Sequence, residues 1–393
     1  MASSASPLKS LPEDILIEIL TRLPVKSILR FKSVSKHWST LLTAPQFTAA
    51  HLRRSASDNP LLIIRHGQTT GDLLISVLDS NLATLHRDLP LPVPRYDDFS
   101  ASIVGSCNGL LCLEYRTTRA ALWNPATKQF AWIPDLDLRS PFRHVTRFVA
   151  IAESYGFGFN GEIEDYRWVK FAGFYYRDRS REDEAIWESL EVKAAVFSWK
   201  SWSWKELRGA RIPAASYGHA VAANGHLYWI GGGEGMRDFV LAFDLVADSF
   251  RIVDLPEARP DDGGLLRLDI VARIAAFRSS LELRLYDDDE LEVLVIGENG
   301  VDMRGETWEF MRRYGWFDGS TDRETVESCC EGLWKGLQIF RLMRGGSRDH
   351  LYLFDTGSKA IRRFDDLVGI VFGVGSFVHS LIPVRGVNNG VEL

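Results

Sequence analysis

The chain has 393 residues, of which 46% are hydrophobic and 25% charged, and its formal net charge at pH 7 is −6. This composition is typical of a folded protein. No run of about 18 apolar residues occurs, so we expect no membrane-spanning helix, and we expect no membrane partner. Four cysteines in a chain of this length exclude a disulfide framework, so we expect the cytosol or the nucleus as its compartment.

The charge is unevenly distributed along the chain. Residues 1–54 contain eight basic and three acidic residues, a net charge of +5, which leaves −11 for the remainder. A basic segment ahead of an acidic body predicts an acidic partner for that segment. Nucleic acid would satisfy the charge, but no zinc-finger, homeodomain or RNA-binding signature follows, so we expect no nucleic-acid partner.

Short helices are the first elements that the pattern predicts. Pro24 ends a first helix and Pro45 stops a second apolar stripe, which gives two or three helices within about 40 residues. The apolar positions of the first helix are Ile15, Ile19, Leu20 and Leu23. Such a small unit has little core of its own, so its surplus apolar side chains pack either on the rest of the chain or on another protein.

The segment 11–42, LPEDILIEILTRLPVKSILRFKSVSKHWSTLL, resembles the F-box. Two Leu-Pro pairs, an Ile-Leu pair, Lys-Ser, Arg-Phe, Val and Trp follow one another in the order and spacing of that family. The resemblance implies a unit at 11–54 that docks on the SKP-type adaptor, and through it on the cullin, of an SCF ubiquitin ligase. The implied adaptor contacts are Leu11, Pro12, Ile19, Leu20, Leu23, Pro24 and Ile28. The residues expected to hold the unit together are Phe31, Val34 and Trp38, and Trp38 could serve both roles.

From Pro60 onward, short β-type runs alternate with turn residues, and no series of alternating strands and helices argues for a parallel α/β sheet. One spacing recurs: a strand ends at a turn residue, and an apolar residue follows six positions later. The turn residues are at 79, 124, 198, 244, 297 and 355, with intervals of 45 to 74 residues. This predicts hairpins within an all-β, propeller-like domain of about six blades at 60–385, with five to seven blades possible. A β-sandwich with irregular hairpins is the alternative.

Several motifs in this body resemble the plant F-box-associated domain. They are GSCNGLLCL (105–113), LWNPATKQF (122–130), YGFGFN (155–160), NGHLYWIGG (224–232), FDLVADSFRIVDLP (243–256) and GSFVHSLIPV (375–384). The glycine run at 231–233 departs from the family and gives this part the look of a kelch repeat. Residues 257–345 match poorly, which implies divergent loops or blades and a recognition surface. Within them we expect Trp316 and Phe317 to contact the target.

No constellation in the sequence predicts catalysis, a metal or a cofactor. The glycine-rich GGGEG (231–235) lacks the Lys-Ser/Thr of a phosphate loop. Neither Cys107 and Cys112 nor the adjacent Cys329 and Cys330 has a histidine pair at zinc-finger spacing, so buried thiols are expected. Acidic residues such as Glu162 and Glu164 could imitate glycosidase carboxylates, although such pairs are common in loops.

The sequence therefore predicts a disordered tail (1–10), a small all-α F-box (11–54), an all-β propeller-like domain (60–385) and a second tail (386–393). The first ten residues have no apolar core or cleavage site, so we expect no secretory leader. The function that the resemblance implies is a non-catalytic substrate receptor of an SCF ubiquitin ligase that tethers an unidentified target protein. Two alternatives stay open: an adaptor-binding scaffold outside the ligase, and a β-propeller enzyme acting on carbohydrate.

Overall fold

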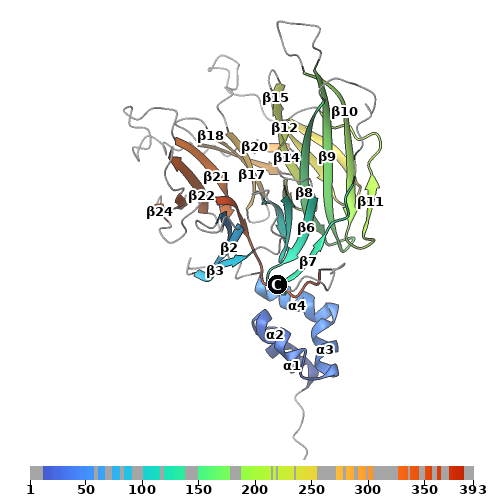
Figure 1. Cartoon of the computed structure of the whole chain (residues 1–393), viewed down its shortest axis with the longest axis vertical. Coiled ribbons are helices and arrows are strands. Elements are labelled where there is room, and N and C mark those ends of the chain that lie inside the picture. The colour runs from blue at the N-terminus through green and yellow to red at the C-terminus, as the bar shows by residue number, and fades with distance from the viewer. Residues whose placement is uncertain are drawn as a thin grey trace, which may run out of the picture.

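The computed structural model of the chain describes residues 12–56, 61–66, 73–79, 84–90, 101–115, 119–136, 138, 149–177, 187–213, 216–217, 220–233, 236–254, 271–277, 280–286, 291–297, 300–303, 326–334, 337–344, 350–355, 361–363 and 371–384. Four helices form one end of the molecule, and the strands that follow form a larger β domain beside them (Figure 1). Among these residues, no helix is both long enough and apolar enough to cross a membrane.

The helical unit contains α1 (Glu13–Leu20), α2 (Val25–Phe31), α3 (Lys36–Thr43) and α4 (Pro45–Ser55). Pro12 and Pro24 directly precede α1 and α2, and the hydroxyl of Ser35 caps α3 by accepting the Trp38 N–H at 3.1 Å. Pro45, which was expected only to stop a helix, is the first residue of α4. Proline is tolerated there because the first N–H groups of a helix have no intrahelical partner.

The β domain is built from antiparallel sheets, which we number 1 to 6 in chain order. Sheet 1 contains β25 (Val371–Ser376), β1 (Leu61–His66), β2 (Leu73–Leu78) and β3 (Thr84–Pro90); sheet 2 contains β4 (Ala101–Cys107), β5 (Leu110–Tyr115), β6 (Arg119–Asn124) and β7 (Gln129–Trp132); sheet 3 contains β8 (Val149–Asn160), β9 (Asp165–Arg177), β10 (Trp187–Ser198) and β11 (Ser203–Glu206).

Sheet 4 contains β12 (Ser216–Tyr217), β13 (Val221–Ala223), β14 (His226–Gly233), β15 (Met236–Asp244) and β16 (Ser249–Asp254); sheet 5 contains β17 (Val271–Phe277), β18 (Ser280–Tyr286), β19 (Leu291–Gly297) and β20 (Gly300–Met303); sheet 6 contains β21 (Val326–Trp334), β22 (Leu337–Arg344), β23 (His350–Asp355) and β24 (Ile361–Arg363). Sheet 4 has five strands because β12 and β13 both pair with β14, and each of the other described sheets has four.

Sheet 1 joins the two ends of the β domain. Its first strand, β25, comes last in the sequence and pairs antiparallel with β1, with Leu61 opposite Ser376. Neighbouring sheets adjoin through the strands at the start of each sheet: β25 lies beside β4, β4 beside β8, and β8 beside β12 and β13. The series continues through β17 and β21 and returns to β25.

The six hairpins expected from the turn spacing are confirmed. Each lies between the last two strands of one sheet, as in the pairing of β6 with β7 or of β15 with β16. In these two turns, the side-chain oxygen of Asn124 or Asp244 accepts backbone N–H groups two and three residues later. Lys128 and Asp248, four positions after the turn start, have φ values of 59° and 52°, which reverse the chain.

The core of the β domain lies between neighbouring sheets. Successive side chains of β5 point to opposite faces, so Leu111 and Leu113 pack towards sheet 1 while Leu110 and Cys112 pack towards sheet 3. A third cluster, around the fully buried Trp229, fills the space between sheets 3 and 4. Sheets 2 and 3 therefore have both faces covered, which the sandwich alternative would not require.

Candidate protein-interaction surface

The helical unit has a compact core that its four helices share. Leu20, Val25, Ile28, Leu41, Leu42 and Phe47 are buried there, together with Leu381 from the far end of the chain. Leu20 and Ile28 were expected to contact an adaptor, and the structure instead buries both side chains inside the chain. A helical stripe marks which face of a helix is apolar, but it does not say which protein covers that face.

The exposed apolar side chains of this unit lie mainly on α1. Ile15 and Ile19 are one helical turn apart, and their exposed fractions are 49% and 46%. Pro12 and Pro24 are also exposed, and Leu23 is half-buried against the core of the helical unit. Leu11 lies outside the described residues. Adjacent exposed apolar side chains are typical of a protein-docking surface, so adaptor contact at these positions stays a prediction.

The three residues expected to hold the unit together differ in how far they are buried. Phe31 and Trp38 are half-buried, and their rings pack edge to face with centroids 5.4 Å apart. Val34 was expected in the core, but it is 66% exposed. It lies in the turn between α2 and α3 and is largely exposed, so the prediction for Val34 is wrong.

The basic and acidic residues of the helical unit lie largely on different helices. Lys26, Arg30 and Lys36 are exposed on α2 and α3, while the acidic residues lie at α1, where Glu18 pairs with Arg22 at 2.5 Å. Burial lowers the pKa of Lys32 from its usual value. Helices α2 and α3 therefore present positive charge within the same small unit as the exposed isoleucines of α1, which suits a partner that is acidic and has an apolar groove.

His51 is a structural residue that sequence reasoning missed. It is buried in α4, and its Nε2 lies 3.1 Å from the carbonyl oxygen of Leu23, in the turn between α1 and α2. Desolvation lowers the pKa of His51, and the hydrogen bond to the Leu23 carbonyl opposes that shift in part. Neutral His51 thus ties α4 to the second Leu-Pro pair. Its position four residues after the buried Phe47 was the available signal.

The carboxylates and thiols that were considered for catalysis or metal binding lie on the β domain. Glu162 and Glu164 are both exposed in the turn after Asn160, whose side chain accepts the Glu162 N–H at 2.8 Å. Burial raises the pKa of the Cys107 thiol to about 12 and that of Cys112 well above its usual value. Within the described ranges, no three His, Cys, Asp or Glu residues form a group that could bind a metal ion.

The glycine-rich run lies partly in a strand, and the expected target contacts lie outside the described residues. Of the glycine-rich run 231–235, the first three residues form the end of β14 rather than a loop. A Cβ on Gly231 would meet the rings of Phe239 and Tyr217 at 2.5 Å, so glycine is needed there for packing. Trp316 and Phe317, proposed as target contacts, lie outside the described residues, as do the side chains of Cys329 and Cys330.

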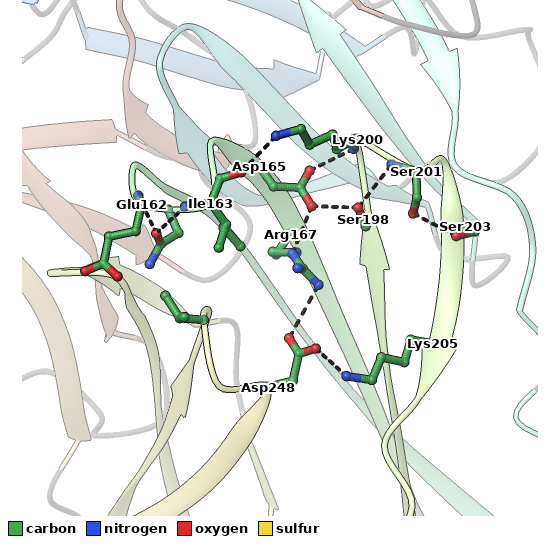
Figure 2. Close-up of polar contacts among 12 residues, drawn as sticks. Glu162, Ile163, Asp165, Arg167, Ser198, Lys200, Ser201, Ser203, Lys205 and Asp248 are labelled. Carbon is green, nitrogen blue, oxygen red and sulfur yellow. Dashed lines mark hydrogen bonds and ion pairs between the residues drawn. The ribbon is translucent and has the colours of Figure 1, made fainter.

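Figure 2 shows a charged network on the turns of sheets 3 and 4. Asp165 accepts the Ser198 hydroxyl at 2.6 Å and the Lys200 N–H at 2.8 Å, and it pairs with Arg167 at 3.0 Å. Arg167 also pairs with Asp248 of the neighbouring sheet at 3.4 Å. The charged groups of Asp165, Arg167, Asp248 and Lys205 are all paired, so the network is suited to joining two sheets rather than to chemistry.

Comparisons with known proteins identify two families along this chain. The F-box domain matches residues 8–49, and the F-box associated beta propeller domain matches residues 74–295. Among curated proteins, the F-box protein CPR1 of Arabidopsis thaliana is 28% identical over 277 residues, covering 66% of this chain and 64% of that protein. A putative F-box only protein 15 of the same plant is 28% identical, covering 64% of this chain and 61% of the relative. The matched part of the chain thus spans less than two thirds of the length of these relatives.

Two solved structures illustrate the likeness of the fold to known ones, and both have low similarity scores. TolB from Acinetobacter baumannii has a TM-score of 0.42 and 10% identity, with 85% of this chain and 73% of that chain covered. A periplasmic gluconolactonase from Pseudomonas aeruginosa has a TM-score of 0.39 and 9% identity, with 81% and 99% covered. At these scores neither likeness carries an argument about fold or function.

Proposed function

Because this chain belongs to the plant F-box proteins that carry an F-box-associated β-propeller domain, we propose that it is the substrate receptor of an SCF ubiquitin ligase. The observation that carries the proposal is the exposed Ile15–Ile19 face of α1 in the same small unit as the exposed basic residues of α2 and α3. A SKP-type adaptor that is acidic around an apolar groove would bury this face. The core of the unit is already complete, so the exposed isoleucines remain available for docking.

The mechanism that we propose is proximity. Binding a target on the β domain while the F-box is bound to the adaptor and cullin raises the effective concentration of target lysines near a ubiquitin-carrying enzyme. In this scheme the chain contributes binding and orientation, and the catalytic cysteine belongs to another subunit. We place the assembly in the cytosol, the nucleus or both.

We infer that the six sheets are the six blades of one propeller. The support is the closed series of strands at the start of each sheet, in which β25 lies beside both β4 and β21. The β25–β1 pair would then close the ring, as a propeller requires to avoid free strand edges. Figure 1 shows β9 and β10 rising away from the helices, and we place the target surface on that side of the domain.

Adaptor binding tests the proposal with a pair of matched substitutions. Ile19→Asp and Ile252→Asp change the same residue type at nearly equal exposure, 46% and 47%, but only Ile19 lies on the F-box. We expect Ile19→Asp to weaken the affinity for a SKP-type adaptor at least about a hundredfold by placing a charge in an apolar interface. Ile252→Asp, on β16, should bind like the parent, and both variants should unfold like it because both sites are exposed.

Equal adaptor binding by the parent and Ile19→Asp would remove the α1 face from the proposal, and a folded parent that does not bind would overturn the proposal itself. Reconstituted ubiquitination of a co-purified target would then separate a ligase receptor from a scaffold. No specific observation on the described residues favours the scaffold or the carbohydrate-active enzyme over the receptor.

A further inference from the structure

The eight residues after the closing strand β25, 377–384, contact three separate cores, and we refer to them as the strap. Phe377 is fully buried between sheets 1 and 2, and Val384 is buried between sheets 2 and 3. Between them, Leu381 is 4% exposed and lies among Leu20, Ile28 and Leu42 of the helical unit. One short segment therefore spans the F-box and two junctions of the β domain.

The strap is fixed to sheet 2 by polar contacts that leave Leu381 little freedom. The side-chain amide of the buried Asn124 donates to the carbonyl oxygens of Ser380 at 3.2 Å and Ile382 at 2.8 Å, on either side of Leu381. The side-chain oxygen of Gln129 accepts the Val384 N–H at 3.0 Å. These bonds set the position of Leu381 relative to sheet 2 before any contact with the helices is counted.

The same turn of sheet 2 also contacts the helical unit directly. Ala126 packs against both the F-box core and the core between sheets 1 and 2. Asn124 shapes this turn through its side-chain oxygen while its amide binds the strap. The F-box thus rests on a platform that consists of the 124–128 turn and the strap.

We propose that the strap is a positioning element. When the β domain closes, the strap completes the core of the F-box and fixes the orientation of the F-box for adaptor binding. The proposal rests on the proposed receptor function for its adaptor part. Leu381 supplies one of the seven buried side chains of the F-box core, so the four helices are incomplete without it. A small unit that depends on one external side chain loses a large share of its stability when that side chain is removed.

Hydrogen exchange measured by mass spectrometry on the full chain tests the first part without any adaptor. We expect Leu381→Ala to speed amide exchange in α2, α3 and α4 by about tenfold or more, because truncation leaves a cavity in their core. Leu241→Ala is the matched control, since Leu241 is also buried, at 0% exposed against 4% for Leu381, but lies in β15 between sheets 3 and 4. It should leave exchange in the helices unchanged. Leu381→Met, which conserves volume, should restore most of the protection and guards against a variant that fails to fold.

The polar anchor provides an independent pair of variants. Asn124→Ala and Asp244→Ala each remove the side chain that shapes a hairpin turn, but only Asn124 also binds the strap. We expect faster exchange in the F-box helices for Asn124→Ala alone. Exchange in those helices equal to the parent's, in both Leu381→Ala and Asn124→Ala, would overturn the proposal.

Adaptor affinity tests the second part on the same proteins. Leu381→Ala should bind a purified SKP-type adaptor at least about tenfold more weakly than the parent, although Leu381 itself is buried and cannot touch the adaptor. Parent-like affinity together with faster exchange would overturn the coupling to adaptor binding. Absence of binding by the parent would instead overturn the proposed function, and the exchange results would still decide whether the strap completes the F-box.

Discussion

Gly109 lies in the two-residue turn between β4 and β5, where it and Asn108 have φ values of +81° and +51°. This is the geometry of an Asn-Gly hairpin turn, which explains the pair in the GSCNGLLCL motif. Gly109 has a second constraint, because a Cβ there would lie 2.3 Å from the carbonyl oxygen of Val378 in the strap. The turn of sheet 2 and the chain end are therefore packed directly against each other.

Gly109→Ala should destabilise the protein much more than Gly209→Ala. Both glycines have positive φ, +81° and +72°, but a Cβ on Gly209 would meet nothing within 4 Å. Strain alone should cost about 1–2 kcal/mol in the free energy of unfolding at Gly209, and the clash should raise the cost at Gly109 to about 2–5 kcal/mol. Urea unfolding of both variants measures the difference, and equal losses would show that the strap moves aside freely.

His51 predicts a pH dependence of the F-box. Burial lowers its pKa below the unfolded value of 6.5, so the unfolded chain binds a proton more readily than the folded one. The stability from neutral His51 is therefore fully present above about pH 6.5 and is lost as pH falls through the folded pKa. Relative to the intrinsic exchange rate, which itself falls with pH, the protection of the α4 amides should decrease as the pH falls from 7.5 to 5.5. His51→Gln should abolish this extra change, whereas the exposed His37→Gln should retain it.

At the scale of elements, one turn geometry recurs along the chain. Asn124, Asn160, Ser198 and Asp244 each begin a turn, and each is followed four positions later by a residue with positive φ. Turns of sheets 3 and 4 also carry charge. Asp165 pairs with Arg167 within sheet 3, while Asp248 of sheet 4 pairs with Arg167 and Lys205 of sheet 3. The partners of Asp165 and Asp248 differ in burial, so the contributions of the two carboxylates to the free energy of unfolding can be measured separately.

Asp165→Asn should cost more stability than Asp248→Asn. Asp165 is buried and accepts from Ser198 and Lys200 while it pairs with Arg167, so an amide there leaves donors facing each other. We expect a loss of about 1–3 kcal/mol in the free energy of unfolding. Asp248→Asn keeps the positive φ that asparagine tolerates and breaks pairs that include the exposed Lys205, so the loss should be about 1 kcal/mol or less. The reverse order in chemical denaturation would contradict the assignment.

Local features of this fold could be predicted from sequence, and features that depend on distant segments could not. The turns at Asn124 and Asp244 follow from side-chain-to-backbone bonds within three residues, so their spacing was enough to place them. The burial of Leu20 and Ile28 depends partly on Leu381, more than 350 residues away, which no helical stripe encodes. Val34 was misplaced for the same reason, because an apolar residue in a pattern was taken as buried without knowledge of what lies opposite.

At the scale of the whole molecule, a helical unit with net positive charge is mounted on an acidic β domain. Residues 1–54 carry +5 and the remainder −11. This separation of charge orients the molecule in the field of an acidic partner so that the F-box faces it first. Its effect belongs to the rate of association, since exposed charges contribute more to steering than to final affinity.

The association rate with an acidic SKP-type adaptor should therefore fall with salt, by on the order of tenfold between about 20 and 300 mM. Replacing the exposed Lys26 and Arg30 of α2 by glutamine should lower the rate at low salt and flatten this dependence. The matched control replaces the exposed Arg208 and Arg211 after β11, which removes the same charge from the β domain. Stopped-flow measurements that show the same salt slope for both pairs would contradict steering by the F-box.

The position of β25 in sheet 1 has a consequence for how the protein is made. Its partner β1 leaves the ribosome about 300 residues before β25 is synthesised, which at roughly 5–20 residues per second is a delay of about 15–60 s. During that time β1 has an unpaired edge and the helices lack Leu381, so we expect β1 and the helices to mature only after β25 and the strap are made. A message that ends before codon 371 would yield a chain without both the closing strand and the strap, and such a product would present an open strand edge to chaperones and proteases.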